Sequence, residues 1–304
     1  MSVNTLVRKI REKNNPTVAG LDARLEYIPA YITEKYTAQY GKTLKAAAAS
    51  MMEFNKGLID ALHDIVPAIK PQAAYYELLG PDGAVVLRDT IAYAHEKGMY
   101  VIADIKRNDI GATASAYANA YLGETPLGEK ADSAFPVDFV TVNAYLGLDG
   151  VEPFRKASAV RGGGIFALVK TSNPSGVQLQ DLKIGERTVY EVMGDLVSEW
   201  GKDCIGEHGY SSIGAVVGAT YPEQGAALRQ RLPHTFFLVP GYGAQGATGK
   251  DLRGCFDAQG RGAVVNASRS ILTAWRKQPG VDFAQAAYNE AVRMREDIME
   301  GIRA

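Results

Sequence analysis

The chain is poor in the residues that build disulfide frameworks and metal centres. It contains 2 cysteines and 4 histidines in 304 residues. Cys204 and Cys255 lie far apart without C-x-x-C spacing, which argues against a disulfide framework or a zinc site and favours a reducing cytoplasm. The histidines are scattered, and none has the spacing of a metal-ligand pair. We therefore expect no metal site and a cytoplasmic location.

An excess of one charge and long apolar runs are also missing. The formal net charge is −1, which gives no electrostatic footprint for nucleic acid or an anionic membrane. No apolar run approaches the length that spans a bilayer, and the basic first residues lack the apolar core of a signal peptide. With 46% hydrophobic residues, the sequence predicts a globular protein whose partners are small molecules.

What the sequence does contain is a regular alternation of two patterns. Eight short apolar runs typical of strands are separated by stretches with the period of a helix. The runs lie at 17–22, 66–71, 100–106, 138–143, 164–171, 213–220, 236–240 and 262–267. This alternation predicts an α/β fold, a (β/α)8 TIM barrel forming a single domain over 1–304. We expect a short amphipathic helix over 1–16 before it and an insertion at 122–136.

The third apolar run carries the strongest chemical signal. Alternate residues of a strand face the same way, so Asp104 and Lys106 project to one side and the apolar residues between them to the other. An isolated pair of this kind is most often a solvated ion pair at a strand end. A further charge follows at once at Asp109. The three charges together favour a functional site.

The ends of the first two strands supply matching charges. Asp22 ends the first run and Lys70 lies at the end of the second, so acid and base alternate along three consecutive strands. In TIM barrels the active site lies at the carboxyl ends of the strands. Burying any one of these charges alone would be costly. The pattern therefore predicts an interleaved network of charges at one mouth of the barrel.

A glycine-rich segment follows the seventh strand, from Pro240 to Gly249, and Ser268-Arg269 follows the eighth. Barrels commonly bind phosphate in these two loops, and Arg269 would add a bidentate charged contact. The segment also matches the dinucleotide pattern G-x-G-x-x-G. That pattern needs an acidic residue at the end of the next strand, where this chain has Asn266. Phosphate is the favoured ligand.

Together, these motifs resemble the orotidine 5′-phosphate decarboxylase family, and within it the longer bacterial form. The resemblance covers nearly the whole chain, with the motifs in the family's order. It rests on Asp22, K-P-Q-A-A-Y-Y-E at 70–77, D-x-K-x-x-D-I at 104–110, V-K-T-S-N-P at 169–174, Pro240-Gly241, Gln245-Gly246 and Ser268-Arg269-Ser270. The D-x-K-x-x-D pattern alone is only moderately specific, because related barrels acting on sugar phosphates share it.

The resemblance implies a reaction and a set of roles. Orotidine 5′-phosphate would be decarboxylated to uridine 5′-phosphate, the last step of de novo pyrimidine nucleotide synthesis, without a cofactor. Lys106 would protonate C6 of the pyrimidine, and Asp104 would lie against the departing carboxylate. Lys70 and Asp22 would complete the charged array and contact the ribose. Asp109 is also among the implied catalytic residues.

The resemblance further implies a homodimer, with Asp109 and Thr113 reaching the neighbouring subunit's site. Ser172 would hydrogen-bond the pyrimidine, and Gln245 and Arg269 would hold the 5′-phosphate, with Tyr242 as an alternative to Gln245. The implied substrate-binding residues are Asp22, Ile110, Thr113, Ser172, Pro240, Gln245 and Arg269.

Two alternatives stay open at this point. A magnesium-dependent enzyme acting on a sugar phosphate, such as a 3-keto-hexulose-phosphate synthase or decarboxylase, would share the motif at 104–109. A catalytically silent barrel would bind a phosphorylated ligand as a regulator. Ser172, with no obvious extra metal carboxylate, favours the pyrimidine substrate. Asn55, on the apolar side of its helix, has no explanation in the sequence.

Overall fold

The computed structural model describes residues 2–243 and 246–303, and at its centre is a closed barrel of eight parallel strands. Around the barrel the strands follow the order β1, β12, β11, β10, β7, β6, β3, β2. They are β1 (Thr17–Leu21), β2 (Ala68–Pro71), β3 (Tyr100–Arg107), β6 (Phe139–Val142), β7 (Gly164–Lys170), β10 (Ser211–Val217), β11 (Thr235–Pro240) and β12 (Ala263–Ala267). Each overlaps one of the eight expected runs, which confirms the TIM barrel.

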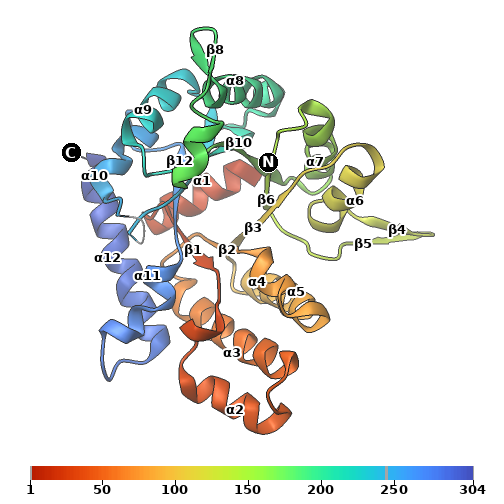
Figure 1. Ribbon diagram of the computed structural model, residues 1–304, viewed down its shortest axis with the longest axis vertical. Coiled ribbons are helices and arrows are strands. Elements are labelled where there is room, and N and C mark those ends of the chain that lie inside the picture. The colour runs from red at the N-terminus through yellow and green to blue at the C-terminus, as the bar shows by residue number, and fades with distance from the viewer. Residues whose placement is uncertain (1, 244–245, 304) are drawn as a thin grey trace.

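Helices surround this barrel (Figure 1). They are α1 (Ser2–Lys13), α2 (Ala30–Tyr40), α3 (Leu44–Leu62), α4 (Ala73–Glu77), α5 (Gly80–Glu96), α6 (Gly111–Tyr121), α7 (Leu148–Arg161), α8 (Val189–Gly201), α9 (Pro222–Arg231), α10 (Gly249–Leu252), α11 (Arg269–Leu272) and α12 (Phe283–Arg303). Short 3-10 turns are η1 (Leu25–Tyr27), η2 (Pro174–Gln178), η3 (Lys202–Cys204), η4 (Arg253–Cys255) and η5 (Ala274–Lys277).

Several helix ends follow directly from local sequence. The side chain of Thr43 accepts a hydrogen bond from the Ala46 N–H and caps α3, and Thr188 and Glu191 form a capping box at the start of α8. Gly98, just after α5, has φ of +72°, a conformation that glycine adopts without the steric penalty of a side chain.

The strands separate an inner core from an outer one. Inside the barrel, aromatic and branched side chains such as Tyr100, Phe139 and Phe166 pack together. The outward side chains of β3 belong instead to the larger core beneath the helices. This alternation confirms the two faces expected for β3. It also places the even-numbered residues of β3, including Asp104, on the inner side of the barrel.

Helix α1 fills the amino-terminal end of the barrel. Its side chains Val3, Leu6 and Val7 are buried against the inner core. The helix ends at Lys13, before the expected limit of residue 16, and Asn14 then takes a positive φ. The barrel is thereby packed at this end, which leaves the carboxyl ends of the strands as the place for a site.

Two hairpins interrupt the alternation and were not expected as strands. One pairs β4 (Thr125–Leu127) with β5 (Lys130–Asp132) inside the expected insertion, and it projects from the barrel in Figure 1. The other pairs β8 (Lys183–Ile184) with β9 (Arg187–Thr188) between β7 and α8. Their strands are two or three residues long and almost wholly exposed, so they lack the apolar pattern that identifies the barrel strands.

The structure explains the buried Asn55 of α3. Its Nδ2 donates to the Tyr76 hydroxyl at 3.0 Å and to Thr90 Oγ1 at 3.1 Å. Tyr76 lies on α4 and Thr90 on α5, so one amide ties three helices together. Burial raises the pKa of Tyr76, which keeps this hydroxyl neutral.

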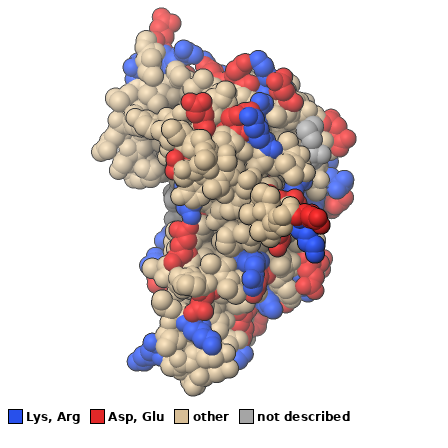
Figure 2. All heavy atoms as spheres, turned by 90° about the vertical axis from the view of Figure 1, so that its right-hand side faces the viewer, with Lys and Arg blue, Asp and Glu red and all other residues tan. Residues whose placement is uncertain are grey.

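The surface carries no extended field of one sign on the face that includes α6 and α7. Figure 2 shows basic and acidic side chains interspersed over this face. Within the described residues, none of the helices combines the length and apolar character needed to cross a bilayer.

Candidate active site

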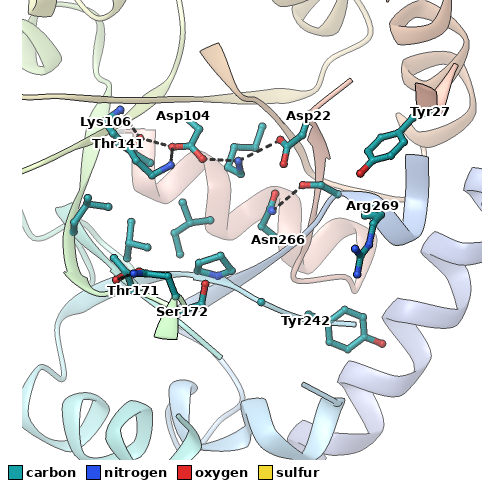
Figure 3. Close-up of a pocket in the computed structure, with 18 residues that line it drawn as sticks. Asp22, Tyr27, Asp104, Lys106, Thr141, Thr171, Ser172, Tyr242, Asn266 and Arg269 are labelled. Carbon is teal, nitrogen blue, oxygen red and sulfur yellow. Dashed lines mark hydrogen bonds and ion pairs between the residues drawn. The ribbon is translucent and has the colours of Figure 1, made fainter. Parts of the chain in front are cut away.

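A cavity of about 610 Å³ lies at the carboxyl ends of the barrel strands. Among the residues singled out in the sequence, those that line it are Asp22, Lys70, Asp104, Lys106, Ser172, Pro240, Tyr242 and Arg269. Asp22, Asp104 and Lys106 lie along one side, and Thr171 and Ser172 lie on the opposite side (Figure 3). The fold therefore brings together residues that are up to 247 positions apart, from Asp22 to Arg269.

Asp104 is the centre of the charged array. Its Oδ2 accepts from Lys70 Nζ at 2.7 Å, and its Oδ1 accepts from Lys106 Nζ at 2.5 Å. Lys70 Nζ also lies 3.8 Å from Asp22 Oδ1. The side chains therefore form the chain of alternating charges that the strand ends predicted (Figure 3).

Two neutral side chains complete the hydrogen bonding of Asp104. Thr141 Oγ1 donates to Oδ1 at 2.7 Å, and Gln72 Nε2 donates to Oδ2 at 3.0 Å. Sequence reasoning gave neither residue a role. Gln72 could have been noticed because it lies two residues after Lys70, but Thr141 becomes visible only through the register of β3 with β6, which pairs Ala103 with Val140.

The electrostatics keep Asp104 ionised. Burial by itself would raise the pKa of this carboxyl, but the charges of Lys70 and Lys106 outweigh it and hold the pKa well below its ordinary value. Burial would likewise lower the pKa of Lys70, and the carboxylates of Asp104 and Asp22 instead raise it. The charged forms of Asp104 and Lys70 are thus stabilised by neighbouring charges rather than by solvent.

The two lysines differ in access. The Lys70 side chain is 4% exposed, whereas that of Lys106 is 45% exposed at the cavity. Lys106 also has φ of +46°, a left-handed conformation that is uncommon for a residue with a side chain. Its N–H donates to Thr141 Oγ1 at 3.0 Å. The backbone turns at Lys106 and directs the side chain back to Asp104.

The opposite wall of the cavity is formed by the segment after β7. Ser172 lies there beside Thr171, and its backbone packs closely on Gly218, which follows β10. A Cβ at Gly218 would lie 2.8 Å from the Ser172 nitrogen, so only glycine permits this approach. Pro240 at the end of β11 lines the same cavity.

The end of the cavity near β12 and α11 holds Arg269, the first residue of α11. Gln245 falls outside the described residues. The Tyr242 hydroxyl donates to Asp297 Oδ2 at 2.7 Å and points away from the cavity in Figure 3. The buried Asn266 lines the cavity as well; it donates to Ser268 Oγ at 3.3 Å, and its Oδ1 has no hydrogen-bond partner.

Three of the expected residues do not line this cavity. Asp109, Ile110 and Thr113 lie at the turn between β3 and α6, where Ile110 and Thr113 are exposed. Asp109 Oδ1 accepts from the Ile110 N–H at 2.8 Å. In a single chain these residues are therefore separate from the array around Asp104.

The residues of the site do not form an evident metal centre. Within the described part of the chain, no group of three or more His, Cys, Asp or Glu side chains is arranged to hold a metal ion. The polar groups at the cavity instead suit an anionic ligand, because Lys106 and Arg269 reach it from different elements.

Comparison with known proteins gives a consistent result. The model of the orotidine 5′-phosphate decarboxylase / HUMPS family matches residues 46–279. The chain is 46% identical over 281 residues to an orotidine 5′-phosphate decarboxylase of Rhodopirellula baltica, covering 91% of this chain and 90% of that protein. It is 40% identical over 297 residues to one of Caldicellulosiruptor bescii, covering 98% and 97%.

A solved structure shows the same likeness in three dimensions. The structure of OMP decarboxylase from Leishmania donovani matches with a TM-score of 0.74 and 28% sequence identity. The match covers 100% of this chain and 99% of the other.

Proposed function

We propose that Lys106 of this chain, which belongs to the orotidine 5′-phosphate decarboxylase / HUMPS family and is a carboxy-lyase for orotidine 5′-phosphate, protonates C6 of the pyrimidine. The reaction would need no cofactor. The carbon–carbon bond to the carboxylate breaks, and its electron pair stays on C6. The Lys106 ammonium then transfers a proton to C6 and later regains one from solvent. The products are carbon dioxide and uridine 5′-phosphate.

The single observation that carries this proposal is the difference between the two lysines bound to Asp104. Lys70 is enclosed, with its ammonium held by Asp104 and close to Asp22. Lys106 reaches the same carboxylate from the cavity side and is accessible to a ligand. Of the two, Lys106 is therefore suited to donate the proton, and Lys70 to stabilise the charge of Asp104.

The size of the electrostatic effects supports the role of Lys106. Two like charges about 4 Å apart repel by about 4 kcal/mol at an effective dielectric of 20, which estimates the repulsion between Asp104 and a substrate carboxylate. Enzymes typically lower barriers by about 8–23 kcal/mol. Repulsion alone is therefore too small. We infer that the larger share comes from a preorganised cation at the carbon where negative charge develops, and the exposure of Lys106 at the cavity supports this role for it.

Binding groups away from the reacting carbon complete the site. We assign Ser172 to the pyrimidine and Arg269 to the 5′-phosphate, because they lie on different walls of the cavity from the charged array. Asp22 and Lys70 would contact the ribose, which joins the pyrimidine to the 5′-phosphate. Gln245 stays a proposed phosphate ligand, and Tyr242 is the weaker alternative because its hydroxyl is bound to Asp297. Pro240 would contact the substrate through its ring.

The active unit is proposed to be a homodimer in the cytoplasm. Exposed apolar side chains lie in the turn that carries Asp109 and Thr113, at Ile110, and near the start of α7, at Tyr145, Leu146 and Leu148. Gly150 of α7 brings the two segments together, because a Cβ there would lie 3.0 Å from the Asp109 carbonyl oxygen. An exposed apolar cluster beside polar residues is typical of an interface. Asp109, Ile110 and Thr113 would then reach the neighbouring subunit's site. Cys204 and Cys255 are both free, which fits a reducing compartment.

The reaction is tested by following the ultraviolet absorbance of orotidine 5′-phosphate with chelator-treated enzyme. We expect rapid conversion to uridine 5′-phosphate. Lys106→Ala should abolish turnover while still binding uridine 5′-phosphate, and Lys202→Ala, at an exposed lysine, should behave as the wild type. Near-normal turnover by Lys106→Ala, or activity only on a sugar phosphate with magnesium, would overturn the proposal.

The shared site is tested by mixing two impaired variants, Lys106→Ala and Asp109→Ala. If subunits exchange, half of the dimers are mixed, and each has one site with both native residues. The mixture should regain about a quarter of the wild-type activity per site. An activity no greater than the sum of the two separate variants would contradict a site shared between subunits.

A further inference from the structure

A second buried lysine, besides Lys70, lies near the cavity and is not used by the proposed chemistry. Lys170 is the last residue of β7 and is 1% exposed. Its Nζ donates to Asp181 Oδ1 at 2.5 Å. A buried charge is costly unless it is paired, so Lys170 holds Asp181 in place. Asp181 lies in the segment that connects β7 to α8, ten residues after Thr171.

Two aromatic rings complete the surroundings of Lys170. Its Nζ lies 4.7 Å from the ring centre of Tyr221 and 5.3 Å from that of Tyr190. An ammonium over aromatic faces is stabilised by the ring quadrupoles. Tyr190 belongs to α8 and Tyr221 immediately precedes α9. The lysine therefore joins the end of β7 to three elements around it.

The segment between Thr171 and Asp181 folds back on its own beginning. Gln180 Oε1 accepts from the Thr171 N–H at 3.0 Å, and Gln180 Nε2 donates to Thr171 Oγ1 at 2.7 Å. Gln180 is the neighbour of Asp181, and Thr171 is the neighbour of Lys170. We call the two hydrogen bonds between Gln180 and Thr171 the amide clamp. The ion pair and the clamp are therefore adjacent, and both join the start of this segment, at 170–171, to its end, at 180–181.

Ser172 is the next residue along this segment. Its backbone packs on Gly218 on one side, and the clamp at Thr171 holds it on the other. Its position relative to the cavity therefore depends on where the clamp is held. The buried pair of Lys170 and Asp181 fixes that position against the body of the barrel.

We propose that Lys170 and Asp181 are positioning residues that hold the 171–181 segment in the shape that presents Ser172 to the substrate. This inference rests on the proposed role of Ser172. Neither residue of the pair lines the cavity, so the pair acts only through the segment. Loss of the pair should release the segment and lower turnover without changing the array around Asp104.

The experiment is a double-mutant cycle measured as kcat/KM with Lys170→Met, Ser172→Ala and the variant carrying both. We expect Lys170→Met to lower kcat/KM about tenfold in the wild-type background and less than about twofold when Ser172 is already alanine. Lys183→Met changes an exposed lysine of the same connection and should leave kcat/KM unchanged. Equal factors in both backgrounds would show that Lys170 acts on the fold in general and would overturn the proposal.

Asp181→Asn provides a second test that leaves the lysine in place. It should show the same dependence on Ser172 as Lys170→Met, and Asp181→Glu should restore part of the activity. If Lys170→Met fails to fold, the Asp181→Asn cycle decides the question. Wild-type kcat/KM in Ser172→Ala would overturn the role of Ser172 and this inference together. An impaired Ser172→Ala with additive effects of the pair would overturn only the inference.

Discussion

The hydroxyl of Thr141 lies between the backbone of Lys106 and the carboxylate of Asp104. It accepts from the Lys106 N–H at 3.0 Å and donates to Asp104 Oδ1 at 2.7 Å. Because Lys106 has φ of +46°, its backbone conformation is one that the surrounding structure must hold in place. One threonine therefore orients both the proposed proton donor and the anion beside it.

This relationship predicts the effect of Thr141→Val, which keeps the shape of the side chain and removes both hydrogen bonds. We expect kcat to fall about tenfold, since a hydrogen bond to a charged group contributes about 1.5–3 kcal/mol. Steady-state kinetics would measure it. Thr141→Ser keeps the hydroxyl and should stay close to the wild type. A valine variant with unchanged kcat would refute the orienting role.

The charged array predicts how stability depends on pH. The pKa of Asp104 is held below its ordinary value, so its contribution to stability is fully present above about pH 4 and is lost as the pH falls through the folded-state pKa. Below about pH 4 the unfolding free energy of the wild type should fall more steeply than that of Asp104→Asn. The difference in slope approaches about 1.4 kcal/mol per pH unit.

Urea unfolding at a series of pH values measures these slopes. Asp82→Asn removes an exposed carboxylate on α5 and should follow the wild type. If the unfolding free energies of the wild type and Asp104→Asn fall with equal slopes below about pH 4, Asp104 is not held ionised by its partners.

Arg269→Ala is predicted to impair both binding and chemistry. A charged hydrogen bond contributes about 1.5–3 kcal/mol, so KM should rise about ten- to a hundredfold. If binding energy at the phosphate also closes the site, kcat should fall as well. Steady-state kinetics separates the two effects. Arg88→Ala, at an exposed arginine of α5, is the matched control, and an unchanged KM in Arg269→Ala would exclude a phosphate contact.

Asn55→Ala should lower stability without touching the cavity. The variant leaves the Tyr76 hydroxyl and Thr90 without the amide donor, in a region where burial of unpaired polar groups costs about 1–3 kcal/mol. The free energy of unfolding in urea should drop by about that amount. Lys56→Ala, on the exposed side of the same helix, should change it little. An equally small effect of both substitutions would mean that the amide does not join the three helices.

The barrel could be predicted from the sequence because its signal is local. Apolar runs bounded by polar residues mark each strand, and the alternation within β3 places Asp104 and Lys106 on one face without any knowledge of the neighbours. The hairpins β4–β5 and β8–β9 were not predicted, because exposed strands of two or three residues have no such apolar pattern.

The site was only partly predictable because some of its residues are identified by contacts across strands. Charged residues at strand ends are conspicuous, and four of them form the array. Thr141 and Gln72 are ordinary polar residues until the strand register brings them to Asp104. The bond of Tyr242 to Asp297 spans 55 positions and has no local sign.

The position of helix α1 determines how substrate enters and product leaves the cavity. Because Val3, Leu6 and Val7 fill the amino-terminal end of the barrel, the cavity communicates with solvent at its carboxyl-terminal mouth. A cavity with a single opening must release its product before the next substrate can bind. The nucleotide product therefore occupies the path of the next substrate, and it should compete with that substrate for the enzyme rather than leave by a separate exit.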